Sequence, residues 1–259
     1  MTRRTLLTSI GATFAASAVS VNAAAESRVE KTIFVGEARV RVVVDEVRIK
    51  GHRSLIYFHP HENEHGSAVV TRHIIQQNGG KMVEIRSEGD RLITFRLKGS
   101  TYSFDPNRMF TDIGLAHSLG HFGPTSEPAL LAAKKLRNAV LAELGGGKTP
   151  IIAVHNNAED GVDTLSFRPG GPLAAQAAKI AVNPKENSHD FFVVLDSGLF
   201  DRLHHQGFNT VLQSANPPDD GSLSVFCQQH HWQYVNVEAA DVDMNEQQRM
   251  LAALPSTLV

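Results

Sequence analysis

Short apolar runs recur along this chain, and stretches with helical periodicity lie between them. Residues 54–58 and 151–154 form two of these runs, and neither alternates regularly between apolar and polar positions. A continuous apolar run of this length is typical of a strand buried on both faces, in a sheet that helices cover on both sides. We therefore expect an α/β fold with a mixed, mostly parallel central sheet flanked by helices.

The expected elements follow from periodicity and from capping and turn residues. A helix should follow the strand at 54–58 and end at Gly79-Gly80, and Ser126 should cap a helix that ends at Leu144 before three glycines. Residues 105–124 are rich in Asp, Pro, Asn and Gly and are expected to form a loop. Further strands are expected at 40–47, 81–85, 91–97, 191–195, 210–212 and 234–237, and further helices at 172–180, 199–206 and 222–229.

The composition restricts the class of protein further. The chain has 259 residues, of which 42% are hydrophobic and 20% are charged, and this suits one sizeable core; we expect one domain over residues 28–259. The formal net charge of −2, without a long basic run, argues against a protein that binds nucleic acid. A single cysteine, Cys227, excludes a disulfide within the chain and is expected to be a buried thiol.

The first residues have the features of an export signal. Arg3 and Arg4 precede an apolar stretch, residues 10–21, that is too short for a permanent membrane anchor. Alanines at 23–25 suit signal peptidase. We expect residues 1–25 to be a cleaved signal of the twin-arginine or the general secretory type, which predicts a periplasmic or secreted protein without a stable membrane anchor.

A cluster of metal-binding residue types follows directly after the strand at 54–58. Two overlapping His-x-x-Glu pairs occur there, His59 with Glu62 and His61 with Glu64. Catalytic zinc sites take three protein ligands, commonly His and Glu, and leave a position open for water. A His and a Glu three residues apart in a tight turn can reach one ion together, so either pair could supply two of the three ligands.

Three further motifs follow this cluster in order. Asp105-Pro106-Asn107-Arg108 lies in the turn-rich segment, His155 follows the apolar run 151–154, and Glu238 follows the last expected strand. The motifs, in this order and in this context, resemble the zinc carboxypeptidase family and its deacylase relatives in the succinylglutamate desuccinylase and aspartoacylase superfamily. The resemblance covers most of the chain after the signal, and it implies a zinc carboxypeptidase-like fold.

The resemblance also implies a role for each motif. One zinc ion would activate a water molecule, an Asn-Arg pair would bind a free carboxylate at the end of the substrate, and a glutamate would act as general base. An arginine fork suits this task because it pairs with both oxygens of a carboxylate. The residues implied are His59, Glu62 and His155 for zinc, Asn107 and Arg108 for the carboxylate, and Glu238 for the base.

Two choices stay open at this stage. His59 and Glu62 are preferred as the ligand pair because His59 directly follows the strand, and His61 with Glu64 is the alternative. The arginine that stabilises the oxyanion in this family has no clear match here, and Arg91 and Arg96 are the candidates. The resemblance places Leu212 where typical members of the family have a tyrosine, so it implies no particular substrate preference.

Three other sets of polar residues have a structural and a functional interpretation. His117 and His121 stand four residues apart, but the glycines around them favour a loop that lines a cleft over a second metal pair. Asp219 and Asp220 precede Gly221, where they suit an Asx turn and could also favour a basic substrate. Trp232 and Tyr234 are expected to pack in the core.

The predicted function is that of an exported, zinc-dependent metallocarboxypeptidase-like hydrolase. It would cleave an amide bond next to the free carboxylate of a short peptide, and the expected compartment suggests a cell-wall peptide. One alternative is a zinc amidohydrolase that removes acyl groups from N-acyl amino acids. A second alternative is a non-catalytic periplasmic binding domain of the same fold.

Overall fold

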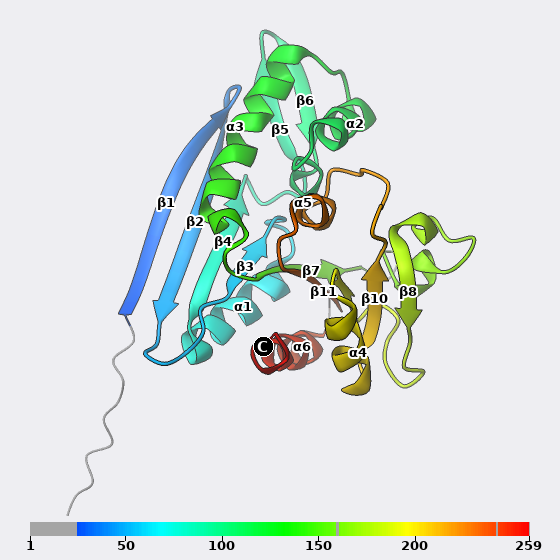
Figure 1. Cartoon of the computed structure of the whole chain (residues 1–259). Helices are drawn as coiled ribbons and strands as arrows, with labels where there is room; N and C mark the ends of the chain where they lie inside the picture. The colour runs from blue at the N-terminus through cyan, green and yellow to red at the C-terminus, as the bar shows by residue number, and fades with distance from the viewer. Residues whose placement is uncertain (1–24, 159–160, 242, 259) are drawn as a thin grey trace, which may run out of the picture.

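A nine-stranded mixed sheet runs through the part of the chain described by the computed structural model, which comprises residues 25–158, 161–241 and 243–258 (Figure 1). Its central strands are parallel, and antiparallel strands flank them. In sheet order the strands are β1 (Ala25–Val35), β2 (Ala38–Arg48), β4 (Gly80–Arg86), β3 (Ile56–His59), β7 (Ile151–Asn157), β11 (Tyr234–Ala240), β9 (Phe191–Val194), β10 (Asn209–Gln213) and β8 (Ala177–Ala181).

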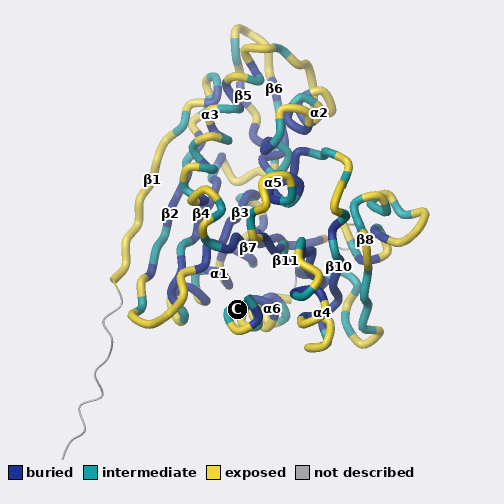
Figure 2. The backbone as a smooth tube through the Cα atoms, viewed as in Figure 1, coloured by how far each residue is buried: buried dark blue, intermediate teal, exposed yellow. Residues whose placement is uncertain are grey.

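Helices cover both faces of this sheet. One face carries α2 (Asp112–Phe122), α3 (Glu127–Glu143) and α5 (Leu223–His230), together with a separate hairpin of β5 (Ile93–Leu97) and β6 (Ser100–Phe104). The other face carries α1 (His65–Asn78), α4 (Ser197–His205) and α6 (Met244–Thr257). Figure 2 shows the buried central strands between these layers and the exposed strand β1 at one edge. No helix among the described residues is long and apolar enough to cross a membrane.

Alternation along the central strands decides which side chains meet on each face. Phe58 of β3 and Ala153 of β7 belong to the core under α3 and α5, whereas Tyr57 and Val154 belong to the core under α1 and α6. Successive residues of a strand point to opposite faces. His155 therefore lies on the same face as Ala153, and His59 points to the opposite face with Tyr57.

Most of the expected elements are confirmed, as is the mixed α/β fold class. The strands predicted at 54–58, 81–85 and 151–154 correspond to β3, β4 and β7, and the Ser126 side chain caps α3 by accepting from the Ala129 amide. The export signal predicted for residues 1–25 lies, apart from Ala25, outside the described residues. Strands β1 and β6 and helix α6 were not predicted.

Two predicted elements are wrong. The helix expected at 172–180 is a short 3-10 helix, Ala174–Gln176, followed by β8, because pairing with β10 at the sheet edge overrides the helix propensity of its alanines. The loop expected at 105–124 contains a 3-10 helix, Pro106–Arg108, and the whole of α2. Glycine had indicated a loop there, but Gly114 is required for packing.

Gly114 of α2 is in close contact with Gly221. A Cβ atom on Gly114 would lie 2.0 Å from Gly221 Cα, and Gly221 has a φ of +78°, which favours glycine. The Phe110 amide also donates to the Gly221 carbonyl at 3.0 Å. These contacts hold the loop 214–221, which leads from β10 into α5, against α2.

Replacing Gly114 with alanine should therefore destabilise the protein. We expect Gly114→Ala to lower the free energy of unfolding by about 3 kcal/mol, because the backbone of Gly221 cannot yield without losing its own contacts. Urea denaturation followed by circular dichroism measures this. Gly120→Ala in the same helix is the matched control, because its Cβ would meet only Thr125 Cγ2, at 3.8 Å. Its free energy of unfolding should rise by up to about 1 kcal/mol, since alanine favours a helix over glycine. Equal effects of the two substitutions would contradict the packing argument.

Candidate active site

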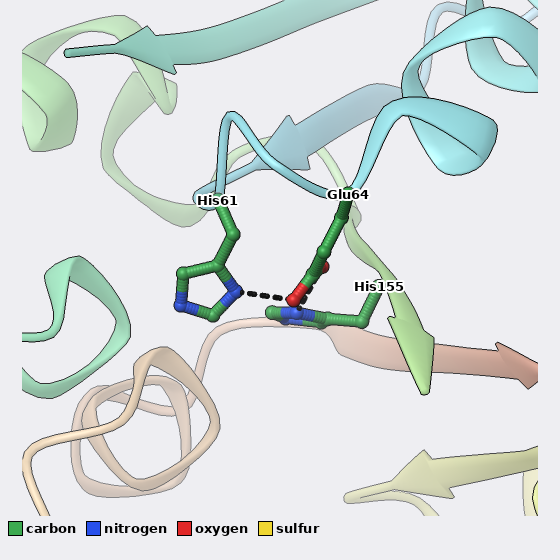
Figure 3. A group of neighbouring side chains, drawn as sticks. All are labelled: His61, Glu64 and His155. Atoms are coloured by element: carbon green, nitrogen blue, oxygen red, sulfur yellow. Dashed lines mark hydrogen bonds and ion pairs between the residues drawn. The ribbon is translucent and has the colours of Figure 1, made fainter. Parts of the chain in front are cut away.

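His61, Glu64 and His155 form a buried group with the residue types of a metal centre. One ligand atom from each of them lies within 4.8 Å of the others. Figure 3 shows the three side chains pointing toward one another, two from the loop between β3 and α1 and one from β7. Each residue is at most 3% exposed. Within the described residues, parallel pairing of β3 with β7 brings together chain positions that are about ninety residues apart.

The Glu64 carboxylate is the centre of this group. Its Oε1 lies 2.8 Å from Nδ1 of His61, and its Oε2 lies 3.1 Å from Nδ1 of His155 and 3.2 Å from the amide nitrogen of Asn156. The Arg91 guanidinium donates to Oε1 at 2.6 Å. Both imidazole rings thus direct the Nδ1 atom toward one carboxylate, which leaves the Nε2 atoms for other partners.

Asp105 orients His61 from the opposite side. Nε2 of His61 lies 2.8 Å from Asp105 Oδ1, a contact that would let the ring donate from Nε2 and present Nδ1 to a metal ion. Asp105 itself is held by the Asn107 amide, at 2.7 Å, and by the Ser118 hydroxyl, which accepts from the Asp105 amide. A carboxylate behind a metal-binding histidine fixes its tautomer and raises its basicity.

The charges of these groups are strongly coupled. Burial alone would lower the pKa of His61, but the Glu64 and Asp105 carboxylates outweigh it and raise the pKa to about 9. Burial alone would raise the pKa of Glu64 and of Asp105, but the facing histidines hold both values well below the ordinary range. At neutral pH the two carboxylates therefore face a protonated His61 and the Arg91 guanidinium, and a divalent cation would bind by displacing the His61 proton.

The donor set fits zinc. Two imidazoles and one carboxylate are ligands of catalytic zinc sites that keep one position for water. Ligand atoms ~2.1 Å from a tetrahedral ion lie about 3.4 Å apart, close to the 2.8 Å and 3.1 Å separations found around Glu64. Nε2 of His155 is buried without a hydrogen-bond partner among the described residues, and Gln247 holds the strand beside it by donating to the His155 carbonyl at 3.1 Å.

The preferred ligand pair of the sequence analysis, His59 and Glu62, is not part of this group. Nε2 of His59 lies 2.9 Å from the Glu64 carbonyl oxygen, and its Nδ1 faces Glu84 at 3.7 Å on the other side of the sheet. Glu62 accepts from the amides of Ser87 and, at 2.9 Å, Gly89. The structure instead brings His155 together with His61 and Glu64, the alternative pair. The reason is that side chains alternate between the two faces along β3, so His59 points to the face opposite His155.

Glu238 lies beside the metal-ligand candidates on the same face. It pairs in register with His155 across the parallel strands β11 and β7, so the two side chains project in the same direction. Asn236 donates to its carboxylate at 2.8 Å. Burial and the negative charge of Glu64 raise the pKa of Glu238 against the opposing effect of His155.

The carboxylate-binding candidates share a cavity with Glu238. Asn107 and Arg108 line it near the end of the 3-10 helix, and Glu238 lines it from β11. The Asn107 side-chain oxygen accepts from the Leu223 amide at 3.3 Å, which anchors this loop to α5. The predicted base and the predicted carboxylate clamp thus border one space next to the group of His61, Glu64 and His155.

The structure also separates the two arginine candidates. Arg91 contacts Glu64 and, at 3.5 Å, Asp105, whereas Arg96 is exposed on β5 and uses its backbone carbonyl to bind the Glu37 amide. Sequence reasoning could not place Arg91 because its segment carries no motif. Gln247 of α6 was missed as well, since nothing in its sequence context indicates a role.

Comparisons with known proteins gave structural matches only. No protein-family model matches the sequence, and no curated protein matches it. The structure is similar to that of a succinylglutamate desuccinylase/aspartoacylase from Rhodobacter sphaeroides, with a TM-score of 0.43, 11% identity and coverage of 90% of this chain and 66% of that chain. It is also similar to a protein of that family from Shewanella amazonensis SB2B, with a TM-score of 0.42, 10% identity and coverage of 90% and 73%.

Substitution of the group around Glu64 should remove metal binding. We expect His61→Ala, Glu64→Ala and His155→Ala each to weaken zinc binding by at least about 100-fold. Replacing a residue that only hydrogen-bonds to a metal ligand already lowers metal affinity by about 10–100-fold. Isothermal titration calorimetry and metal analysis of the dialysed protein measure this. Glu62→Gln is the control: its amide oxygen can still accept from the loop amides, so zinc affinity should not change. Loss of zinc in Glu62→Gln, with normal binding in Glu64→Ala, would contradict the site.

Proposed function

We propose that this protein is a zinc-dependent hydrolase that cleaves an amide bond next to a free carboxylate. The observation that carries the proposal is the position of Glu238, which is in register with His155 at the metal-ligand group and also lines the cavity that contains Arg108. A metal, a general base and a carboxylate clamp on one sheet face are the parts that such a reaction needs.

The metal supplies the first part of this chemistry. A zinc ion held by His61, Glu64 and His155 would lower the pKa of a water molecule to about 7 and polarise a carbonyl group. Glu238 would take a proton from the attacking water as its oxygen forms a bond to the amide carbon. The carboxyl group would then return that proton to the nitrogen as the carbon–nitrogen bond breaks, releasing a carboxylic acid and an amine.

The pKa of Glu238 suits both steps. Burial raises it from the ordinary value, which makes the carboxylate a better base and brings its pKa closer to neutral pH. The hydrogen bond from Asn236 limits this rise and orients the carboxylate. Arg91 acts on Glu64 and Asp105 as a positioning residue, because its guanidinium reaches both carboxylates.

Arg108 and Asn107 would select the end of the substrate. The guanidinium group can donate two parallel hydrogen bonds to one carboxylate, which favours a chain end over a chain interior. Short peptides and N-acyl amino acids both present an amide bond next to such a carboxylate. We keep the peptide as the first candidate and the N-acyl amino acid as the second, and propose an exported protein on the basis of the signal-like residues 1–25.

A direct test compares wild type with Glu238→Gln on both substrate classes. With zinc bound, wild type should hydrolyse C-terminal dipeptides or N-acetyl amino acids, and the variant should lose about 10²–10⁴-fold in kcat. Zinc affinity is measured in parallel and should be unchanged in the variant. A zinc-loaded wild type that hydrolyses neither class would contradict the proposal and favour a binding domain, and full activity of Glu238→Gln would remove this residue from the mechanism.

The pH profile provides a second test of the base. Glu238 acts in its deprotonated form, so kcat/KM should rise with pH through a limb centred above 4.5, the ordinary value for a glutamate. Asn236→Ala removes a hydrogen bond that stabilises the carboxylate and should move this limb to higher pH. A limb that stays in place or moves to lower pH in this variant would contradict the assignment.

A further inference from the structure

The cavity beside Arg108 has features that indicate the kind of residue it accepts. Its volume is about 90 Å³, well below the 300–1,000 Å³ of pockets that hold whole small molecules. It has room for one side chain or a similar group. Phe167, Phe191 and Val193 form apolar walls, and Asp220, Tyr234 and Asn236 are among its polar lining residues.

We propose that this cavity selects a released residue with a cationic side chain, and that the Asp220 carboxylate is the residue that selects it. The proposal rests on the proposed function for the identity of the bond that is cleaved, and it adds the substrate class. The ligand would be a basic amino acid residue: its terminal carboxylate would bind Arg108, and its side-chain ammonium group would face Asp220.

Two of the described residues that line the cavity, Asp220 and Glu238, are carboxylates. Among its described lining residues Arg108 is the only cation, and Asp220 Oδ2 lies 3.8 Å from Arg108 Nη1. A substrate carboxylate on Arg108 would therefore approach the negative charge of Asp220 as well. A second carboxylate on the substrate would add to this repulsion, whereas an ammonium group would offset it.

The position of Asp220 is fixed by its surroundings. Oδ1 accepts from the Ser222 amide at 3.0 Å and from the Ser222 hydroxyl at 2.6 Å, so the Asx turn occupies one oxygen and leaves Oδ2 on the side of Arg108. The neighbouring Gly221 is held against Gly114 and its carbonyl accepts from the Phe110 amide. The turn and the packed loop thus hold the carboxylate at the cavity, where its side chain remains 30% exposed.

A second observation points to a ligand that donates hydrogen bonds. Oδ1 of Asn236 is buried and has no hydrogen-bond partner among the described residues, and Asn236 lines the same cavity. A buried acceptor without a partner is costly unless a ligand or water supplies a donor. An ammonium group carries three donors and no acceptor, so it can serve both Asp220 and Asn236.

Binding of amino acids to the zinc-loaded protein tests this proposal without turnover. L-Lysine and L-norleucine differ in the terminal amino group, and L-glutamate carries the opposite charge. Isothermal titration calorimetry should find lysine bound at least about tenfold more tightly than norleucine, and glutamate most weakly. Asp220→Asn should abolish the preference for lysine over norleucine, and norleucine should bind this variant at least as tightly as wild type because the negative charge beside Arg108 is gone.

Asp219→Asn is the matched control for this experiment. It removes the same charge one residue away, but Asp219 is turned toward Thr111, whose hydroxyl it accepts at 2.7 Å, and it does not line the cavity. This variant should keep the preference for lysine. The proposal would be overturned by equal binding of lysine and norleucine, by tighter binding of glutamate, by no binding of any of the three, or by a preference that persists in Asp220→Asn. Failure of the proposed function is read separately, from the absence of hydrolysis by the wild type.

Discussion

The convergence of hydrogen-bond donors on the buried Glu64 carboxylate is the interaction on which the site depends. Two imidazoles, a guanidinium and a backbone amide from three parts of the chain meet at its two oxygens. A buried carboxylate is costly unless it is paired and hydrogen-bonded. The chain itself supplies these partners, and a divalent cation bound there would replace histidine protons as the source of positive charge.

The central sheet determines which residues can reach the site around Glu64. His155 and Glu238 reach the same face because β7 and β11 are parallel and in register, and the loop after β3 brings His61 and Glu64 over that face. Helix α2 and the loop 214–221 then close the space around Arg108 through the contact of Gly114 with Gly221. Glu238, Arg108 and Asp220 thus line one small cavity beside the group of His61, Glu64 and His155.

Particular residues indicate what could be predicted from the sequence. The apolar run before His155 correctly predicted a buried strand there, although β7 continues to Asn157, and the motif order predicted that Glu238 and Arg108 act at one site. The choice between His59 and His61 needed the register of β3 against β7, which puts Phe58 on the face of His155 and His59 on the opposite face. Helix α2 was missed because a glycine that serves packing looks the same in sequence as one that breaks a helix. Arg91 and Gln247 act through tertiary contacts without any local pattern.

A crystal structure of the zinc-soaked protein, with anomalous data collected at the zinc edge, tests the central claim most directly. We expect one strong anomalous peak about 2.0–2.2 Å from Nδ1 of His61, a carboxylate oxygen of Glu64 and Nδ1 of His155. A peak at His59 and Glu62, or no peak near Glu64 when zinc is saturating, would contradict it.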